Sequence, residues 1–200
     1  MRVKLIALSC VLLAVGCKRS PAPSQLSSAE AAEVIGKSKA FTTSIAGPDQ
    51  RVSLNRDGLL ALGAKGYLEC TSVGRKEENV GALTPTPAGI VFIRDWPRVG
   101  VSDSNCSPPG KRFDVSGGVI KPFSLPSCRR KLIAVTSVST EPGVERTVGF
   151  TWRWDTSSIP SDARTIMFGP SGEPPQRQAA VTFSLQDDGW HAQFGHEWEQ

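Results

Sequence analysis

The segment that most constrains the fold is 144–155, VERTVGFTWRWD, in which apolar and polar side chains alternate. Successive side chains of a β-strand point to opposite faces of a sheet. The alternation therefore predicts a strand with one apolar face and one polar face. The apolar face carries Val148, Phe150, Trp152 and Trp154, and the polar face carries Thr147, Thr151 and Arg153.

Three further segments of the C-terminal part are typical of β-strands, and apolar residues gather on one face of the second. Asp187-Asp188-Gly189 is a turn signal directly before the last of them. We therefore predict an antiparallel meander of about four strands over 131–200, with a polar excursion at 156–176. The three segments are 131–139 (KLIAVTSVS), 177–186 (RQAAVTFSLQ) and 190–195 (WHAQFG).

The first half of the chain mixes helix and strand signals. Ser27 and Glu30 have the spacing of a capping box, which predicts a helix over 28–39. Asn55 is placed to cap a second helix that ends at Gly66. Short strands are predicted at 51–54, at 67–73 and within 80–93.

The order of these elements resembles a winged-helix unit over 27–94, on the segments LLALGAKGYLE and ALTPTPAG. In intracellular members of that family the second helix reads DNA. Here that helix offers Arg56 and Lys65, offset by Asp57, which is too little positive charge for a phosphate footprint. We expect a structural or protein-contact module with no nucleic-acid partner. A generic small α/β packing unit is the alternative.

Residues 95–130 are rich in Pro, Gly and Ser and predict a long irregular connection, with one strand near 111–117. The predicted fold class is thus α+β, a small winged-helix-like unit of helices and strands followed by the antiparallel β-meander. On the segments FTWRWD and AVTFSLQDDGW, the chain also resembles a group of uncharacterised bacterial lipoproteins whose N-terminal part is winged-helix-like. This resemblance implies architecture and location and carries no activity.

The N-terminus has the form of a secretory signal. Arg2 and Lys4 precede an uncharged, mostly apolar stretch over 5–15, and residues 1–16 are predicted as a signal peptide. The stretch is shorter than the roughly 20 apolar residues that a membrane span needs. Its removal leaves 21 basic and 19 acidic residues. A net charge near +2 does not mark a nucleic-acid binder.

Ala14-Val15-Gly16-Cys17 resembles the lipobox of bacterial lipoproteins, although that family prefers Leu at the position of Ala14. The resemblance implies that Cys17 is acylated, as with palmitate, and anchors the chain to a membrane. Lys18 stands where the family's inner-membrane retention signal has Asp, which implies the outer membrane, facing the periplasm. Residues 17–26 are then the anchor and a flexible tether. Ordinary secretion with Cys17 as a plain thiol is the alternative.

Cysteine number limits the disulfides of an exported chain. Cys70, Cys106 and Cys128 follow Cys17, and an odd set predicts one bridge and one buried thiol. Three pairings are open. We favour Cys106–Cys128, because both lie in Pro/Ser-rich loop sequence whereas Cys70 lies in a strand-like run. A Cys17 that is not acylated would allow two bridges.

The sequence contains no coherent catalytic set. His191 and His196 are five residues apart, a spacing that suits a shared ligand neither on a strand nor on a helix. Asp187 and Asp188 precede Gly189, where acids stabilise turns. Nucleophile-elbow, zinc-protease and phosphate-loop motifs are absent from the sequence. We therefore expect no catalytic residue, no metal, no cofactor and no enzymatic activity.

The tryptophans are the remaining candidates for a binding site. Trp152 and Trp154 could form a stacking platform for glycans such as peptidoglycan, with Arg153 as a third candidate residue; burial in the core is the alternative. The leading hypothesis is a non-enzymatic, lipid-anchored cell-envelope protein that acts as a protein-interaction or structural module. The alternative is a lipoprotein that binds glycan, peptidoglycan or another small ligand on a Trp-lined sheet face.

Overall fold

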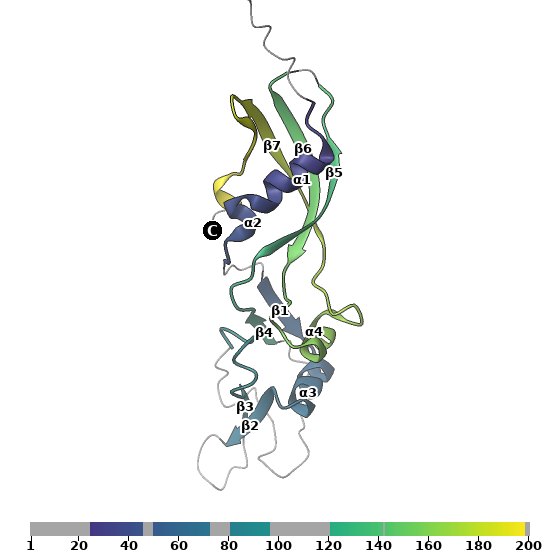
Figure 1. Cartoon of the computed structure of the whole chain (residues 1–200). Coiled ribbons are helices and arrows are strands. Elements are labelled where there is room, and N and C mark those ends of the chain that lie inside the picture. The colour runs from purple at the N-terminus through teal and green to yellow at the C-terminus, as the bar shows by residue number, and fades with distance from the viewer. Residues whose placement is uncertain (1–24, 46–49, 73–80, 97–120, 142, 199–200) are drawn as a thin grey trace, which may run out of the picture.

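The alternating segment forms β6 (Glu145–Trp154), an inner strand of an antiparallel sheet in the order β5–β6–β7–β8. The computed structural model in Figure 1 describes residues 25–45, 50–72, 81–96, 121–141 and 143–198. The predicted four-stranded meander and the α+β class are confirmed. The other strands of the sheet are β5 (Arg130–Val138), β7 (Arg177–Gln186) and β8 (Gly189–Gln193).

The strand register explains why one face of the sheet is buried and apolar. Val148 of β6 lies opposite Val138 of β5 and Val181 of β7. Every second residue of β6 from Arg146 to Trp154 is buried, and the residues between them are exposed or half-buried. We call these the inner and the outer face of the sheet.

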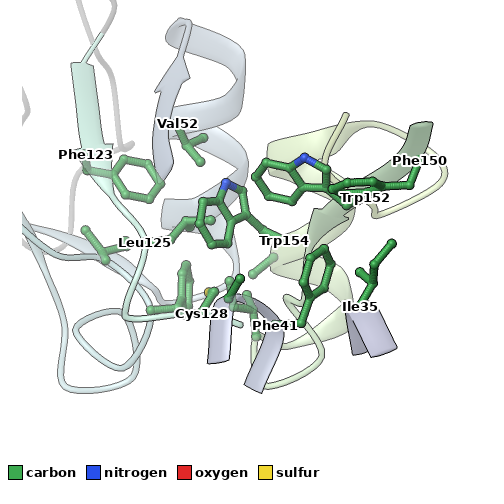
Figure 2. Packing of buried hydrophobic residues seen from close by; sticks show 14 of the residues in the cluster. Ile35, Phe41, Val52, Phe123, Leu125, Cys128, Phe150, Trp152 and Trp154 are labelled. Atoms are coloured by element: carbon green, nitrogen blue, oxygen red, sulfur yellow. The ribbon is translucent and has the colours of Figure 1, made fainter. Parts of the chain in front are cut away.

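Helices α1 (Ser28–Lys37) and α2 (Lys39–Thr42) cover the inner face, and Figure 1 shows α1 crossing the sheet. The predicted capping box starts α1: the Glu30 N–H donates to Ser27 Oγ at 3.2 Å, and the Ser27 N–H donates to Glu30 Oε2 at 3.0 Å. Ile35 of α1 is fully buried, and the Phe41 ring of α2 meets the Phe150 ring edge-on at 5.8 Å (Figure 2). The capping box and the buried apolar residues thus both account for a helix at this position, packed on the inner face of the sheet.

The second part of the molecule lies beyond one end of the sheet (Figure 1). Asn55 caps α3 as predicted, since its Oδ1 accepts the Gly58 N–H at 3.0 Å, and Gly66 follows the helix with a φ of 77°. Two small sheets flank the helices: β1 pairs with β4, and β2 pairs with β3. The elements are β1 (Arg51–Leu54), α3 (Arg56–Ala64), β2 (Leu68–Ser72), β3 (Gly81–Pro85), β4 (Lys121–Ser124), α4 (Ser161–Phe168) and η2, a short 3₁₀ helix (His196–Trp198).

The winged-helix-like arrangement of 27–94 is not confirmed. Helix α1 packs on β5 and β8 of the meander, whereas α3 packs on β1, β2 and α4. Strand β1 pairs with β4 from a distant part of the chain and not with the β2–β3 hairpin. The apolar residues of α1 are buried against the meander, so the two helices contribute to different parts of one continuous hydrophobic cluster.

Four elements fall outside the sequence predictions: α2, η2, α4 and β4. Helix α4 lies in the polar excursion 156–176, although Asp162 in its first turn and Ala163 and Ile166 at helical spacing are usable helix signals. Strand β4 lies inside 95–130, where Pro122 argues against a strand; proline is tolerated here because β4 pairs on one side with β1. The predicted strand near 111–117 lies outside the described residues. In the described part, every helix is too short or too polar to span a bilayer.

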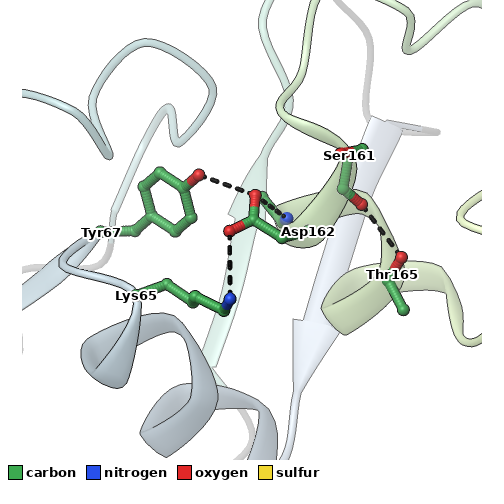
Figure 3. A network of polar contacts seen from close by, with 6 residues as sticks. Lys65, Tyr67, Ser161, Asp162 and Thr165 are labelled. Atoms are coloured by element: carbon green, nitrogen blue, oxygen red, sulfur yellow. Dashed lines mark hydrogen bonds and ion pairs between the residues drawn. The ribbon is translucent and has the colours of Figure 1, made fainter.

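A polar network joins α4 to the loop after α3 (Figure 3). The Tyr67 hydroxyl donates to Asp162 Oδ1 at 2.9 Å, and Lys65 Nζ lies 3.6 Å from Asp162 Oδ2. The hydrogen bond from Tyr67 is the main cause that lowers the pKa of the Asp162 carboxyl. Lys65 and Asp162 are both well exposed, so their ion pair contributes little to the stability of the fold.

Arg130, the first residue of β5, is a buried cation among three tryptophans. Its guanidinium carbon lies 5.4 Å from the ring centroids of Trp152 and Trp154 and 4.7 Å from that of Trp198. Its Nη1 donates to the carbonyl oxygens of Ala40 at 2.9 Å and Trp198 at 2.8 Å. One side chain thereby ties α2, β6 and η2 together.

Substitution of Arg130 tests this role. Arg130→Met removes two charge-assisted hydrogen bonds and three cation–π contacts, and is expected to lower the free energy of unfolding by about 2–4 kcal/mol. Arg130→Lys keeps the charge but not the planar group, and an intermediate loss is expected. Urea denaturation followed by tryptophan fluorescence measures both. Wild-type midpoints in both variants would contradict the assignment.

The network around Asp162 predicts a pH dependence. A carboxyl whose pKa is lowered on folding stabilises the fold above its unfolded pKa, near 4, and that stabilisation is lost as the pH falls through the folded pKa. The difference in unfolding free energy between wild type and Asp162→Asn should therefore shrink between pH 7 and pH 3, as measured by urea denaturation. In a Tyr67→Phe background the same difference should depend less on pH. A pH-independent difference would contradict the assignment.

Candidate functional site

The predicted tryptophan platform is wrong as an exposed surface. Trp152 and Trp154 are 6% and 5% exposed, and their rings meet edge-on at 5.1 Å (Figure 2). Arg130 and Trp198 pack on the Trp152 ring from the inner face. The rings therefore belong to the core, because the helices and η2 cover the face on which they lie.

Arg153, the third candidate residue, lies on the outer face of β6 and is held by an ion pair. Its Nη2 donates to Glu173 Oε1 at 2.6 Å, and its Nη1 contacts Glu173 Oε2. The Arg153 side chain is 15% exposed. It ties the loop between α4 and β7 to the sheet.

A pocket lies where the β1–β4 ribbon, α4 and the sheet meet, and we call it the junction pocket. Its volume is about 140 Å³. Cavities of about this size hold a benzene-sized group. Its lining residues are Gln50, Arg51, Val52, Leu125, Trp154, Phe168, Pro174, Pro175 and Arg177.

Gln50, one of the lining residues, has an unsatisfied acceptor. The residue is 2% exposed, and its Nε2 donates to the Ile45 carbonyl oxygen at 2.7 Å. Because a carbonyl oxygen can only accept, this bond fixes the orientation of the amide. Gln50 Oε1 is buried and has no hydrogen-bond partner in the described part of the chain.

Trp154 supplies the complementary donor. Its Nε1–H is buried and likewise lacks a partner among the described residues. Figure 2 shows its indole beside Val52 and Leu125, two apolar residues of the pocket wall. The residues that line the pocket include the cations Arg51 and Arg177 and no carboxylate. The residues that line the pocket thus carry one unpaired acceptor, one unpaired donor, apolar surface and positive charge.

A smaller polar cavity of about 50 Å³ shares Trp154 and Pro174 with the junction pocket. Arg164 lines it with a buried Nε that has no partner among the described residues. Burial disfavours the charged form of Asp155, which also lines it, but hydrogen bonds from Ser157 and the charges of Lys131 and Arg129 outweigh burial and lower the pKa of Asp155. The cavity is lined by both positive and negative side chains, two of which, Arg153 and Glu173, form an ion pair.

The histidines are not brought together. His191 Nε2 of β8 lies 2.8 Å from Oδ1 of Asp188 in the β7–β8 turn, and this hydrogen bond is the main cause that lowers the pKa of Asp188. His196 lies in η2. Within the described ranges, no group of three or more metal-ligating side chains occurs.

The favoured disulfide Cys106–Cys128 is wrong. Cys128 is a free, buried thiol, and burial raises its pKa to about 11. Its Sγ donates to the Pro126 carbonyl oxygen at 3.1 Å, while its backbone bridges to Ile45. Cys70 is disulfide-bonded, and its partner lies outside the described residues. Cys17 and Cys106 also lie outside them, and lipidation of Cys17 stays a prediction.

Thiol mapping checks this assignment. Alkylation of the folded protein at pH 8 should leave Cys128 unmodified, because the thiol is buried and protonated, and alkylation in urea should modify it. Of the three pairings open among the cysteines after Cys17, only Cys70–Cys106 leaves Cys128 free, so non-reducing peptide mapping should recover that bridge. A bridged Cys128 would contradict the structure.

No protein-family model matches the chain, and no curated protein and no solved structure matches it either.

Proposed function

We propose that the protein is a lipid-anchored, non-enzymatic protein of the bacterial cell envelope that binds a small ligand in the junction pocket. The observation that carries the proposal is that Gln50 and Trp154, two residues that line one pocket, each have a buried polar atom with no partner among the described residues. A buried polar group without a partner costs about 1–3 kcal/mol. A ligand that satisfies both groups removes this cost, which makes the pocket a binding site.

The arrangement of the ionisable groups supports binding rather than catalysis. The carboxylates of Asp162, Asp188 and Glu173 are engaged by Tyr67, His191 and Arg153, three partners from different elements. A general acid or base needs a free position toward a substrate. The unpaired atoms of Gln50 and Trp154 are an amide oxygen and an indole N–H, which hold a ligand without exchanging protons with it at neutral pH.

The start of the folded body supports the proposed anchor. Leu26 is 5% exposed and packs in the core, one residue before the cap of α1. The predicted tether therefore ends where the core begins. With the lipobox-like Cys17 and the signal-like segment 1–16, this supports a body held on the outer membrane and facing the periplasm.

A second candidate function is protein contact through the outer face of the sheet. Small, uncharged polar side chains dominate this face, and the helices that pack on the sheet, α1 and α2, cover the inner face. Such a face fits a neutral polar surface of another envelope protein. Its members include Ser137, Thr147, Thr151, Gln178, Thr182 and Gln193.

Mass spectrometry of the full chain isolated from membranes tests anchor and ligand together. Denaturing spectra should show a mature chain that begins at Cys17 and carries acyl chains, and Cys17→Ser should be soluble. Native spectra in detergent should show a small-molecule adduct on wild type and on the control Gln178→Met, which changes an exposed glutamine of the outer face. Gln50→Met should lose the adduct while it keeps its unfolding transition.

Two results would contradict the proposal. A wild-type mass without acyl chains excludes the anchor. An adduct that is absent from wild type, or retained equally by Gln50→Met, excludes the junction pocket as the ligand site and leaves protein contact as the better candidate.

A further inference from the structure

We infer that the junction pocket recognises the acetamido group of a ligand that also carries a carboxylate. The inference rests on the proposed function, since it names the ligand class of that same pocket. The shared chemistry occurs in N-acetylated acidic sugars and in N-acetylated amino acids. Peptidoglycan supplies the first of these in the proposed compartment.

A ligand that satisfies the unpaired atoms of Gln50 and Trp154 must carry one donor and one acceptor. The bond from Gln50 Nε2 to the Ile45 carbonyl fixes Gln50 Oε1 as an acceptor, and an indole N–H can only donate. An acetamido N–H matches Gln50 Oε1, and its carbonyl oxygen matches Trp154 Nε1–H. A carboxylate at this point would offer acceptors alone and leave Gln50 Oε1 unsatisfied.

The apolar walls of the junction pocket suit the methyl group of an acetamido group. Val52, Leu125 and Phe168 line the pocket with apolar surface, which suits a methyl group. At about 140 Å³ the pocket has room for the four heavy atoms of an acetamido group and not for a whole N-acetylated sugar. The rest of the ligand must therefore lie outside, beside the arginines.

The charges of the lining select an anion outside the pocket. Arg51 is exposed, and Arg177 is half-buried with its guanidinium 5.6 Å from the Trp152 ring. Because the lining contains two arginines and no carboxylate, its charge favours a negative group on the ligand. A carboxylate a few bonds from the acetamido group suits Arg51 best, since that side chain is accessible to solvent.

The test uses four probes and the full mature chain. N-acetylmuramic acid carries both groups on a sugar, N-acetylalanine carries both on an amino acid, muramic acid lacks the acetyl group and N-acetylglucosamine lacks the carboxylate. Calorimetry gives the affinities. Nitrogen-15 NMR follows the indole N–H of Trp154, assigned by its loss in Trp154→Phe. A downfield shift of that signal reports a new hydrogen bond.

We expect muramic acid to bind about tenfold more weakly than N-acetylmuramic acid, the effect of one lost buried hydrogen bond. Gln50→Met should abolish this preference for the acetyl group. Arg51→Gln should abolish the preference of N-acetylmuramic acid over N-acetylglucosamine, whereas Arg94→Gln, a change at another exposed arginine, should not. If N-acetylalanine binds with an affinity comparable to that of N-acetylmuramic acid, the ligand belongs to the N-acetylated amino acids. If N-acetylalanine binds much more weakly, the ligand belongs to the N-acetylated acidic sugars.

Equal binding of muramic and N-acetylmuramic acid, or acetylated probes that leave the Trp154 signal unshifted, would overturn the inference. If native spectra nevertheless show an adduct that depends on Gln50, the pocket binds another ligand class and the proposed function stands. If neither adduct nor probe binding is found, the two polar atoms are satisfied by water alone, and both proposals fail.

Discussion

The buried cation of Arg130 is the interaction on which the rest of the structure depends. A charge in a core is costly unless hydrogen bonds and polarisable groups surround it. Here two backbone carbonyls and the indoles of Trp152, Trp154 and Trp198 do so. These groups come from α2, β6 and η2, so the cation is stable only when all three elements are in place. Side chains that would suit a glycan platform thereby become structural.

The junction pocket follows from the same packing. The end of β6 turns the Trp154 indole toward the β1–β4 ribbon, and the ion pair of Arg153 with Glu173 holds the following loop across the sheet edge. The ribbon brings Gln50 to this point, and its amide is already committed on one side to Ile45. Three separate chain segments thus meet around a space that none of them fills.

Local chemistry made part of this fold predictable from sequence. The alternation of 144–155, the capping box at Ser27 and the turn before Gly189 depend on neighbouring residues, and each prediction agrees with the structure. What α1 packs against, and whether Trp154 is covered, depend on contacts between distant segments. The pocket could not be foreseen for that reason, because Gln50 becomes notable only when its burial and its fixed amide are known.

The position of Leu26 shows at which end of the sheet the folded body begins. Leu26 lines a hollow with Val138 and Arg146, at the end of the sheet where β5 finishes and β6 starts. Trp154 lies at the other end of β6, eight residues further on, or about 26 Å at the rise of a strand. If the chain is held by Cys17, the sheet is a rigid spacer that keeps the junction pocket clear of the bilayer. The pocket then lies at the end of the sheet opposite the attachment point.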